Sequence, residues 1–327
     1  MKAICYRDYG VDNLTLEEVE KPTSSDDEVL VRVRAAALNP IDGHFLRGVA
    51  ISRLILGLRK PRFPRFGSDF AGTVEHAGKN VTQFKSGDKV FGVKRGAMAE
   101  YVCARAEREV ASKPGNVTFA QAASVPIAAL TALQGLRDKG HIKAGRKVLI
   151  NGASGGVGTF AVQIAKSFGA HVTGVCSTRN VDLVRSIDAD HVIDYTKEDF
   201  TKSDQRYDVI FDNVCNHSFA ERGRVLTPNG ICVLVGIGGA GVKEGQAVGR
   251  IVNNLFTARV RSSFTNQKFA VYAIKTNKQD LTTLGDLAQT EKIKPVIERT
   301  YKLSDAPEAM RYLAEGHARG KLVLTVP

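Results

Sequence analysis

The sequence predicts an α/β protein of two domains, a β-rich domain followed by a doubly wound parallel-sheet domain. Short alternating strands separated by turn residues fill the first third of the chain, and apolar strands alternate with helical stretches from about residue 120. The length agrees with this fold class, because 327 residues, 43% of them hydrophobic, are enough to bury two cores.

The β-rich domain is predicted from short strands and the turns between them. Strands are expected at residues 29–34, 71–74 and 89–92, the last preceded by a turn at 85–88. A closing strand at 321–326 needs a sheet to join, so we expect the C-terminal tail to return to this domain. The first domain is therefore expected to cover residues 1–122, completed by 265–327.

The second domain, expected at residues 123–264, shows the βαβ rhythm of a parallel sheet. A helix is predicted at 159–168, and the tail adds helices at 278–291 and 304–316. The predicted strands of the parallel sheet cover residues 147–151, 171–176, 191–194, 208–212 and 230–236.

The positive charge of the chain is concentrated in two acid-free stretches. Lys and Arg number 46 against 34 Asp and Glu, a formal charge of +12, and residues 43–65 and 245–279 hold the whole excess. Both stretches alternate basic with apolar residues, as folded segments do, so we expect no nucleic-acid partner. The charge either steers an anionic cofactor or substrate toward its site or is solvated surface.

Several features of the sequence indicate where in the cell the protein is located. The N-terminus has no apolar region typical of a secretory signal. The longest uncharged stretch, 114–136, contains Pro126 and three amide side chains, so no integral membrane association is expected. Five scattered cysteines favour a reducing compartment over a disulfide framework. We therefore expect a cytoplasmic protein.

A glycine-rich loop carries the strongest functional signal. The apolar strand at 147–151 runs into Gly152-Ala153-Ser154-Gly155-Gly156-Val157-Gly158, and a helix follows. Gly152, Gly155 and Gly158 can provide the tight turn, the close approach of backbone to a pyrophosphate and the close helix packing that a dinucleotide needs. Gly152, Ser154, Gly155, Gly156, Val157 and Gly158 are therefore candidate cofactor-binding residues.

The next strand indicates which nicotinamide cofactor is bound. NAD-binding folds place an acid about 20 residues past the glycines, where it accepts hydrogen bonds from the ribose 2′-hydroxyl. Here the strand ends in Ser177-Thr178-Arg179-Asn180, with no acid. A guanidinium with hydroxyl neighbours suits a 2′-phosphate, so NADPH is preferred to NADH. The alternative is that Arg179 is an ordinary solvated side chain.

With these residues, nearly the whole chain resembles the zinc-free quinone oxidoreductase branch of the medium-chain dehydrogenase/reductase superfamily. The resemblance implies a GroES-like catalytic domain, built from the N-terminal part and the tail, and a Rossmann domain. The landmarks are residues 37–42, 67–72, 84–92, 129–132, the glycine loop, 189–195 and 316–321.

The resemblance also implies that zinc is absent. Alcohol dehydrogenases of this superfamily place a cysteine ligand where this chain has Asn39 and a Gly-His-Glu where it has Gly67-Ser68-Asp69, and the four-cysteine structural lobe is missing.

The family's nicotinamide environment maps to Asn39, His44 and Thr131, of which Asn39 and His44 are the candidate catalytic residues. Ser177, Arg179 and Tyr195 map to the adenosine phosphate pocket, and Gly236, Ile237 and Lys321 would flank the nicotinamide half. Related quinone reductases often carry a tyrosine in place of His44, so either His44 or water is expected to supply the proton.

The expected activity is NADPH-dependent hydride transfer to a quinone or an α,β-unsaturated carbonyl compound, whose developing charge needs no metal. One alternative keeps the cofactor but takes anionic enone acids or enoyl thioesters. Another, of a different class, is an NADPH-responsive protein that binds RNA or a membrane surface through its basic stretches. The resemblance suggests a homodimer formed through the edge of the Rossmann domain.

Overall fold

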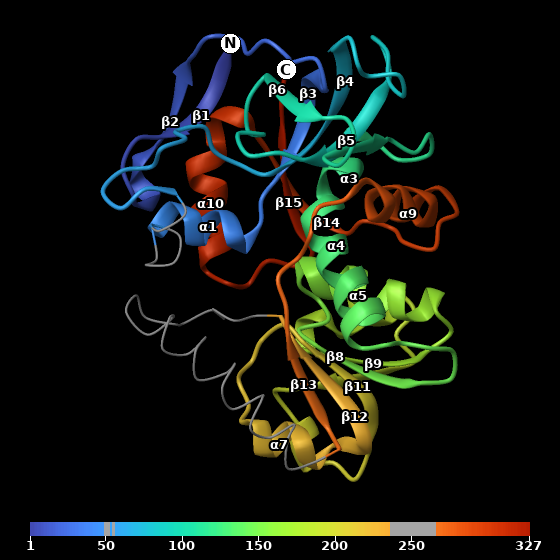
Figure 1. Cartoon of the computed structure of the whole chain (residues 1–327). Helices are drawn as coiled ribbons and strands as arrows, with labels where there is room; N and C mark the ends of the chain where they lie inside the picture. Colours follow the sequence, from blue (N-terminus) through green and yellow to red (C-terminus); the bar gives the residue numbers. More distant parts are fainter. Residues whose placement is uncertain (49–52, 54–55, 236–265) are drawn as a thin grey trace. The chain divides into compact units, whose positions relative to one another are not determined.

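The computed structural model describes residues 1–48, 53, 56–235 and 266–327, which form two compact units (Figure 1). Unit 1 comprises residues 1–130, 275–291 and 295–327, and unit 2 comprises residues 131–274 and 292–294. The chain first leaves unit 1 within one helix, α4 (Pro126–Gln134), a few residues beyond the expected boundary at 122. The other expected boundary, at 264, lies outside the described residues.

Unit 1 is built on a seven-stranded sheet. Its order is β14-β15-β3-β4-β5-β7, and β6 pairs with β3. A separate antiparallel pair is formed by β1 (Lys2–Tyr6) and β2 (Leu14–Glu18). The strands of the large sheet are β3 (Glu28–Ala37), β4 (Asp69–Ala77), β5 (Lys89–Val93), β6 (Tyr101–Arg105), β7 (Val110–Ser112), β14 (Ile297–Lys302) and β15 (Lys321–Thr325).

The C-terminal tail contributes to this sheet. β15 pairs antiparallel with β3, with Leu324 opposite Ala36, so the closing strand joins the N-terminal strands. The alternating pattern of β3 places Val31 and Val33 in the core while Arg32 is exposed. Both valines pack in one cluster with Phe70, Leu322 and other apolar residues of unit 1.

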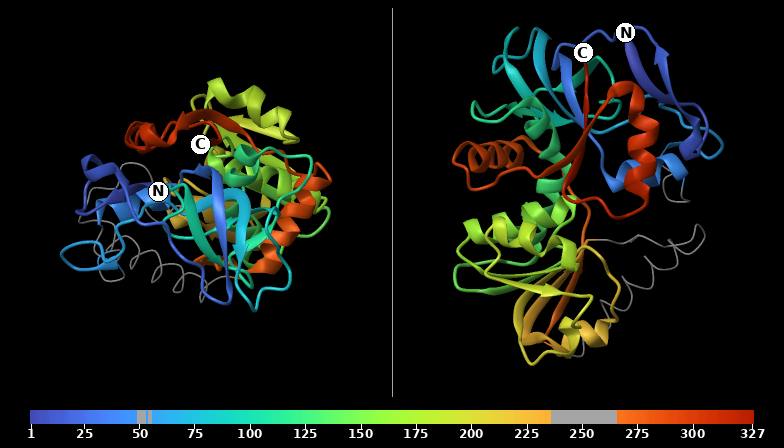
Figure 2. Two further views of the ribbon diagram at one scale, coloured as in Figure 1. Left: turned by 90° about the horizontal axis from the view of Figure 1, so that it is seen from above. Right: turned by 180° about the vertical axis from the view of Figure 1, so that it is seen from behind.

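Helices cover the sheets of unit 1. Figure 2 shows α10 beside the N-terminal strands, and it packs against α1, β2 and the short helix at Val11–Asn13. Besides the start of α4, the α-helices among the described residues of this unit are α1 (Pro40–Arg47), α3 (Phe119–Ser124), α9 (Lys278–Gln289) and α10 (Ala306–Ala314). α9 and α10 fall where the sequence predicts helices, and each is a few residues shorter than predicted.

The described residues of unit 2 form a six-stranded parallel sheet of order β10-β9-β8-β11-β12-β13. The strands are β8 (Lys147–Asn151), β9 (His171–Cys176), β10 (His191–Asp194), β11 (Tyr207–Asp212), β12 (Leu226–Leu234) and β13 (Lys268–Val271). After the end of α4, the part of this unit that the structure describes contains the α-helices α5 (Gly156–Ser167), α6 (Val181–Ser186) and α7 (Phe219–Arg224). The first three strands coincide with the predicted ones, and the predicted fold class is confirmed.

Two differences from the predicted strands of unit 2 have simple causes. β12 begins four residues before the predicted start. The prediction missed these residues because Thr227, Pro228 and Asn229 are polar or turn residues, which are not typical of a strand. β13 is absent from the predicted strands, since Lys268–Val271 is only four residues long and follows a polar stretch. Within the described residues, no helix is long and apolar enough to cross a membrane.

Candidate functional site

The parallel sheet of unit 2 gathers the predicted cofactor residues at one edge. β8, β9, β10 and β11 end at Asn151, Cys176, Asp194 and Asp212, and these ends lie within one residue of one another in the sheet register. Strand order reverses between β8 and β11, and α/β sheets bind ligands at such points, beyond the carboxyl ends of their strands. The candidate residues 152–158, 177, 179 and 195 all follow these strand ends.

The glycine loop has the backbone geometry that a phosphate cradle requires. Gly152 adopts φ of 80°, a left-handed conformation that favours glycine. A Cβ on Gly158 would lie 2.0 Å from the carbonyl oxygen of Gly152, so only glycine allows α5 to pack this closely on β8. Gly155 caps α5, whose first-turn N–H groups have no acceptors within the helix and suit an anion.

Ser177 and Arg179 follow the end of β9, and Tyr195 follows the end of β10. Ser177 is half-buried, Arg179 is exposed and the Tyr195 side chain is 62% exposed. The segment directly after β9 contains no acid, but the end of β10 places one beside it. Asp194 accepts a hydrogen bond from the Thr178 hydroxyl at 2.6 Å, and hydrogen bonds from Thr178 and Thr196 lower its pKa to about 2.

Two buried amide side chains beside the glycine loop lack hydrogen-bond partners. Asn213, directly after β11, buries both polar atoms of its side chain without a partner. Asn180 donates to the hydroxyls of Ser154 and Ser177 at 3.0 and 3.2 Å, but its Oδ1 is unpartnered. Buried unpartnered groups are costly unless a ligand or water completes them. The sequence analysis identified neither residue as a candidate binding group. A polar residue directly after the fourth predicted strand could have indicated Asn213.

A buried ion pair holds the chain after β11 in place. Arg222 Nε lies 2.6 Å from Asp212 Oδ2, and both side chains are buried. The other oxygen of Asp212 accepts hydrogen bonds from Asn151 Nδ2 at 2.8 Å and from the backbone N–H groups of Val214 and Cys215. This cluster links β8, β11 and α7, so it holds Asn213 next to the glycine loop.

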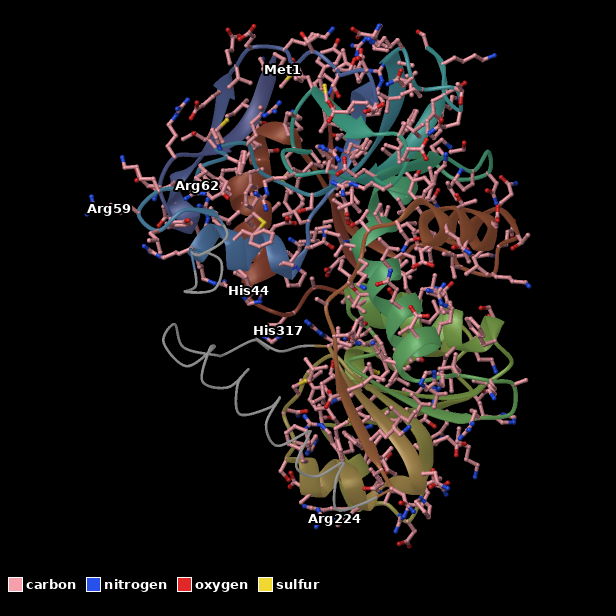
Figure 3. The ribbon with its side chains drawn as sticks, in the orientation of Figure 1. Met1, His44, Arg59, Arg62, Arg224 and His317 are labelled. Atoms are coloured by element: carbon pink, nitrogen blue, oxygen red, sulfur yellow. The ribbon has the colours of Figure 1, made fainter. Side chains whose placement is uncertain are left out.

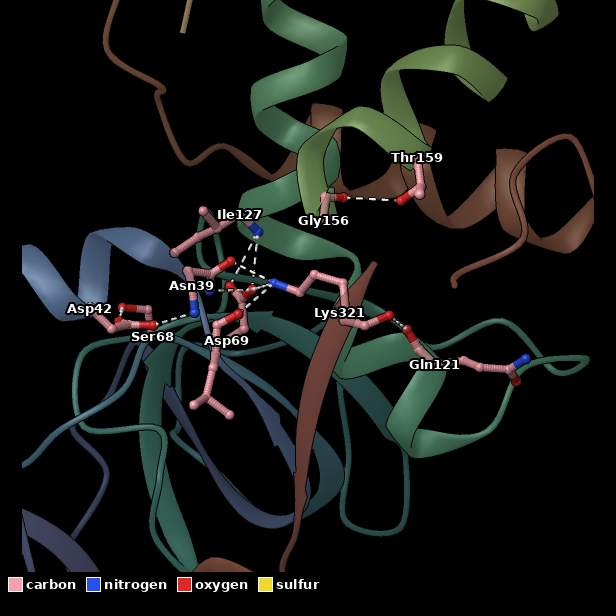
Figure 4. Close-up of polar contacts among 11 residues, drawn as sticks. Asn39, Asp42, Ser68, Asp69, Gln121, Ile127, Gly156, Thr159 and Lys321 are labelled. Carbon is pink, nitrogen blue, oxygen red and sulfur yellow. Dashed lines mark hydrogen bonds and ion pairs between the residues drawn. The ribbon is translucent and has the colours of Figure 1, made fainter. Parts of the chain in front are cut away.

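A second polar cluster lies in unit 1 and is almost entirely buried (Figure 4). Lys321, at the start of β15, points toward Asn39 and Asp69. Its ammonium donates to Asn39 Oδ1 at 2.6 Å and to the Leu38 carbonyl oxygen at 2.9 Å, and lies 3.8 Å from Asp69 Oδ2. Asn39 Nδ2 in turn donates to Asp69 Oδ2 at 2.9 Å.

The neighbours of Asn39 determine which way its amide points. An ammonium has only donors and a carboxylate only acceptors, so Oδ1 must face Lys321 and Nδ2 must face Asp69. The usual ambiguity between amide oxygen and nitrogen is therefore absent. The structure shows one of the two Nδ2 hydrogens engaged, by Asp69.

Two carboxyl groups complete this cluster. Asp69 accepts from the backbone N–H of Ile127, in the first turn of α4, and Asp42 accepts from the Ser68 hydroxyl and the Asn39 backbone N–H. Burial raises the pKa of Asp69 to about 7 and that of Asp42 to about 6, although Lys321 opposes both shifts. Burial also lowers the pKa of Lys321.

The remaining predicted site residues are placed as follows. His44 lies in the last turn of α1, with Nδ1 3.4 Å from Arg47 Nη2, and burial and Arg47 lower its pKa. Thr131 is buried in α4, and its carbonyl oxygen accepts from the Tyr272 hydroxyl. Gly236 and Ile237 lie outside the described residues. Among the residues predicted to surround the nicotinamide, Asn39 and Lys321 are in direct hydrogen-bond contact.

Comparisons with known proteins cover nearly the whole chain. Residues 25–134 match the family model described as an alcohol dehydrogenase GroES-like domain, and residues 187–324 match one described as a zinc-binding dehydrogenase. The chain is 35% identical to a mouse protein, NAD(P)H oxidoreductase RTN4IP1, mitochondrial, over 92% of this chain and 82% of that protein.

An Aspergillus terreus protein named trans-enoyl reductase pgmF is 38% identical over 92% of this chain and 86% of its own length. Among solved structures, the quinone oxidoreductase from Coxiella burnetii superposes with a TM-score of 0.80 at 30% identity, covering 100% of this chain and 99% of that one. The similarity is thus to enzymes that share both units.

Proposed function

Since this chain belongs to the quinone oxidoreductase branch of the medium-chain dehydrogenase/reductase superfamily and is an NAD(P)H-dependent oxidoreductase, we propose that it uses NADPH to reduce quinones or α,β-unsaturated carbonyl compounds. The observation that carries this proposal is the geometry of the glycine loop in unit 2, where a Cβ on Gly158 would lie 2.0 Å from the Gly152 carbonyl oxygen. In unit 1, the buried cluster that orients the Asn39 amide supports it.

The residues of unit 2 fit a dinucleotide. The turn at Gly152, the close packing at Gly158 and the first-turn N–H groups of α5 are suited to a pyrophosphate. The unpartnered amides of Asn180 and Asn213 offer hydrogen bonds that the protein itself does not use. Gly236 and Ile237 remain predicted contacts. Bound NADPH supplies the hydride for the reduction.

A preference for NADPH over NADH is supported by Arg179, whose guanidinium suits the 2′-phosphate that distinguishes the two cofactors. Asp194 opposes it, because its carboxylate is ionised and lies within hydrogen-bond distance of Thr178. Since both oxygens of Asp194 accept from threonine hydroxyls, we propose that Arg179 dominates the choice.

In unit 1, we propose that Asn39 donates a hydrogen bond from its second Nδ2 hydrogen to an oxygen or amide of the bound reactants. Lys321 and Asp69 act through Asn39 as positioning residues, because they leave the amide one orientation. The contact of Lys321 with the cofactor stays a prediction. The contacts that the structure shows for its ammonium are all within unit 1.

Zinc independence is part of the proposal, because the residues at the expected zinc position do not fit that metal. Asn39, Ser68 and Asp69 offer an amide, a hydroxyl and one carboxylate, whereas zinc sites are built from cysteine, histidine and carboxylate ligands. The Lys321 ammonium, 2.6 Å from Asn39 Oδ1, would repel a cation there. Within the described residues, no three His, Cys, Asp or Glu side chains form a metal cluster.

Water is the proton source that the geometry favours. The Arg47 guanidinium can only donate, so His44 Nδ1 accepts from it and the His44 proton lies on Nε2. With its pKa lowered, His44 is a neutral imidazole, which can donate a hydrogen bond but is a weak acid. Replacement of His44 by Phe would then change KM for the acceptor more than kcat.

The test is anaerobic oxidation of NADPH and of NADH with a panel of quinones, enones and enoyl thioesters, with and without a chelator. We expect turnover with at least one conjugated acceptor, a higher kcat/KM with NADPH and no effect of the chelator. The absence of turnover with every conjugated acceptor would contradict the proposal, and loss of activity on chelation would contradict zinc independence.

Enoyl thioesters and anionic enone acids are the second candidate substrates. The relative named trans-enoyl reductase and the acid-free basic stretch 43–65 favour them. A kcat/KM that is high for anionic acceptors and falls with salt would support this candidate. A cytoplasmic location and a homodimer stay predictions, and the related mouse protein is named as mitochondrial.

A further inference from the structure

An exposed loop of unit 1, residues 57–65, combines apolar and basic side chains at its surface. Leu58 is 68% exposed and Phe63 is 55% exposed. Among the described residues, Tyr195 is the one other large hydrophobic side chain that is more than half exposed. Two large apolar side chains this exposed, five residues apart on one loop, are unusual on a protein that has no partner for them.

The base of this loop is firmly held, so its tip projects rather than collapses onto the core. Leu56 and Phe66, on either side of the loop, are buried, and Phe66 packs edge-to-face on Tyr6 with ring centroids 5.4 Å apart. The Arg62 backbone N–H donates to the Leu56 carbonyl oxygen at 2.7 Å, and Arg53 donates to the Leu58 carbonyl oxygen at 3.3 Å.

The exposed apolar groups share their loop with cations, and a further cation contacts Phe63. Arg59, Lys60 and Arg62 are exposed on the same loop, and the Arg95 guanidinium lies 5.4 Å from the Phe63 ring. Figure 3 shows Arg59 at the outer edge of unit 1. The Asp8 carboxylate, 3.6 Å from Lys60 Nζ, offsets one of these four charges.

We propose that the 57–65 loop docks unit 1 onto an anionic phospholipid surface, with Leu58 and Phe63 entering the interfacial region and the basic side chains contacting lipid phosphates. Apolar tips ringed by Arg and Lys are what peripheral binding to anionic lipid requires. The binding is independent of the proposed reductase activity.

Other occupants fit this loop less well. A stable protein partner needs about 800 Å² on each side, from about 20 residues or more, which one projecting nine-residue loop does not supply. A second copy of the chain would bring the same cations against each other. Single-stranded RNA is bound through several stacked aromatic rings, whereas Phe63 is the one aromatic residue between 57 and 65.

The absence of tryptophan from the chain allows a direct test. Phe63→Trp places the single tryptophan of the variant on the loop, and Leu16→Trp, at a site 40% exposed, is the matched control. With vesicles of phosphatidylglycerol and phosphatidylcholine, we expect the emission of the Phe63→Trp variant to shift to the blue and to be quenched by brominated acyl chains, while that of the control stays unchanged. Phosphatidylcholine vesicles alone should give neither response.

Cosedimentation with the same vesicles measures the contribution of each kind of side chain. Removing both charges in Arg59→Gln/Arg62→Gln should weaken binding by roughly thirty-fold, since each basic residue near an anionic surface contributes about five-fold. Leu58→Ser/Phe63→Ser should weaken binding by at least about tenfold. The charge-matched control is Arg224→Gln/Lys292→Gln on exposed sites of unit 2, which should bind like the wild type.

Several results would overturn the proposal. They are an absence of vesicle binding at low salt, binding without a fluorescence response from the Phe63→Trp variant, and binding that the loop variants retain. Tighter binding to single-stranded RNA that survives Leu58→Ser/Phe63→Ser would assign the cations to nucleic acid instead. A dimer that becomes a monomer in that variant would assign the loop to a second copy of the chain.

Discussion

The Lys321 ammonium lies 2.6 Å from the Asn39 amide oxygen, so a residue near the C-terminus orients a side chain at the start of α1. The link exists because β15 pairs with β3, which ends shortly before Asn39. In the proposed function, this contact makes Asn39 a donor toward the reactants.

Lys321→Met tests this contact. Removal of the ammonium takes away the cation beside Asp69, which should lower the free energy of unfolding, and the loss should be larger above about pH 7, where Asp69 is ionised, than below it. Activity should fall as well, with the loss in kcat rather than in KM for NADPH, because the Asn39 amide loses its enforced orientation. Denaturant unfolding and steady-state kinetics measure the two effects.

The double variant Lys321→Met/Asp69→Asn separates folding from positioning. It removes both charges together, so most of the lost stability should return, while kcat should stay low. Lys321→Arg, which keeps the charge, should retain part of the activity. A double variant with wild-type kcat would contradict the positioning role.

The stability of the protein should carry a pH dependence from Asp69. Burial raises its folded-state pKa to about 7, above the ordinary value of 3.8, so the folded state binds the proton more tightly than the unfolded state does. The stability that Asp69 contributes is therefore complete below about pH 4 and is lost as the pH rises to about 7.

Asp69→Asn is the reference for this measurement, because asparagine does not titrate. The free energy of unfolding of the wild type minus that of the variant should fall as the pH rises from about 4 to about 7. A difference that rises over this range would mean that Asp69 is ionised in the fold and that Lys321, not burial, controls its pKa.

Arg179→Ala tests the choice of cofactor. The affinity for NADPH should fall by at least about tenfold while that for NADH changes little, because only NADPH carries the 2′-phosphate. Arg185→Ala, an exposed arginine on α6, is the control and should leave both affinities unchanged. An equal loss for the two cofactors would mean that Arg179 does not contact the 2′-phosphate.

Two glycines of the cradle should respond differently to substitution by alanine. Gly158→Ala should impair folding, since its Cβ would lie 2.0 Å from the Gly152 carbonyl oxygen. Gly155→Ala should fold normally, because its Cβ would have 3.6 Å to its nearest neighbour, yet bind NADPH weakly by blocking the approach of a phosphate. Thermal unfolding and titration with NADPH measure both. Normal NADPH binding by Gly155→Ala would mean that the loop is an ordinary turn and does not bind the phosphates.

Asn213→Ala should affect stability and binding in opposite directions. The side-chain amide of Asn213 is buried without partners, so its removal should leave the free energy of unfolding unchanged or higher. If a bound dinucleotide completes those hydrogen bonds, the affinity for NADPH should fall by about tenfold. A loss of stability together with unchanged affinity would mean that Asn213 has a purely structural role.

Local patterns are enough to predict the parallel sheet and the position of its glycine loop. An apolar strand, a glycine loop and an amphipathic helix are contiguous in the chain, and their geometry depends on neighbours within about a dozen residues. For that reason β8, β9 and β10 have the same bounds in the structure as in the prediction. Short or polar strand segments, such as β13 and the start of β12, carry too little pattern to be recognised.

The buried cluster around Asn39 depends on tertiary structure. Asp69 and Lys321 are 30 and 282 residues away from Asn39, and only the pairing of β15 and β4 with β3 brings them together. In the same way, Asp194 reaches the turn after β9 from a neighbouring strand. Backbone conformation is set largely by adjacent residues, whereas the environment of a charge depends on which distant strands lie beside it, and no local pattern records that.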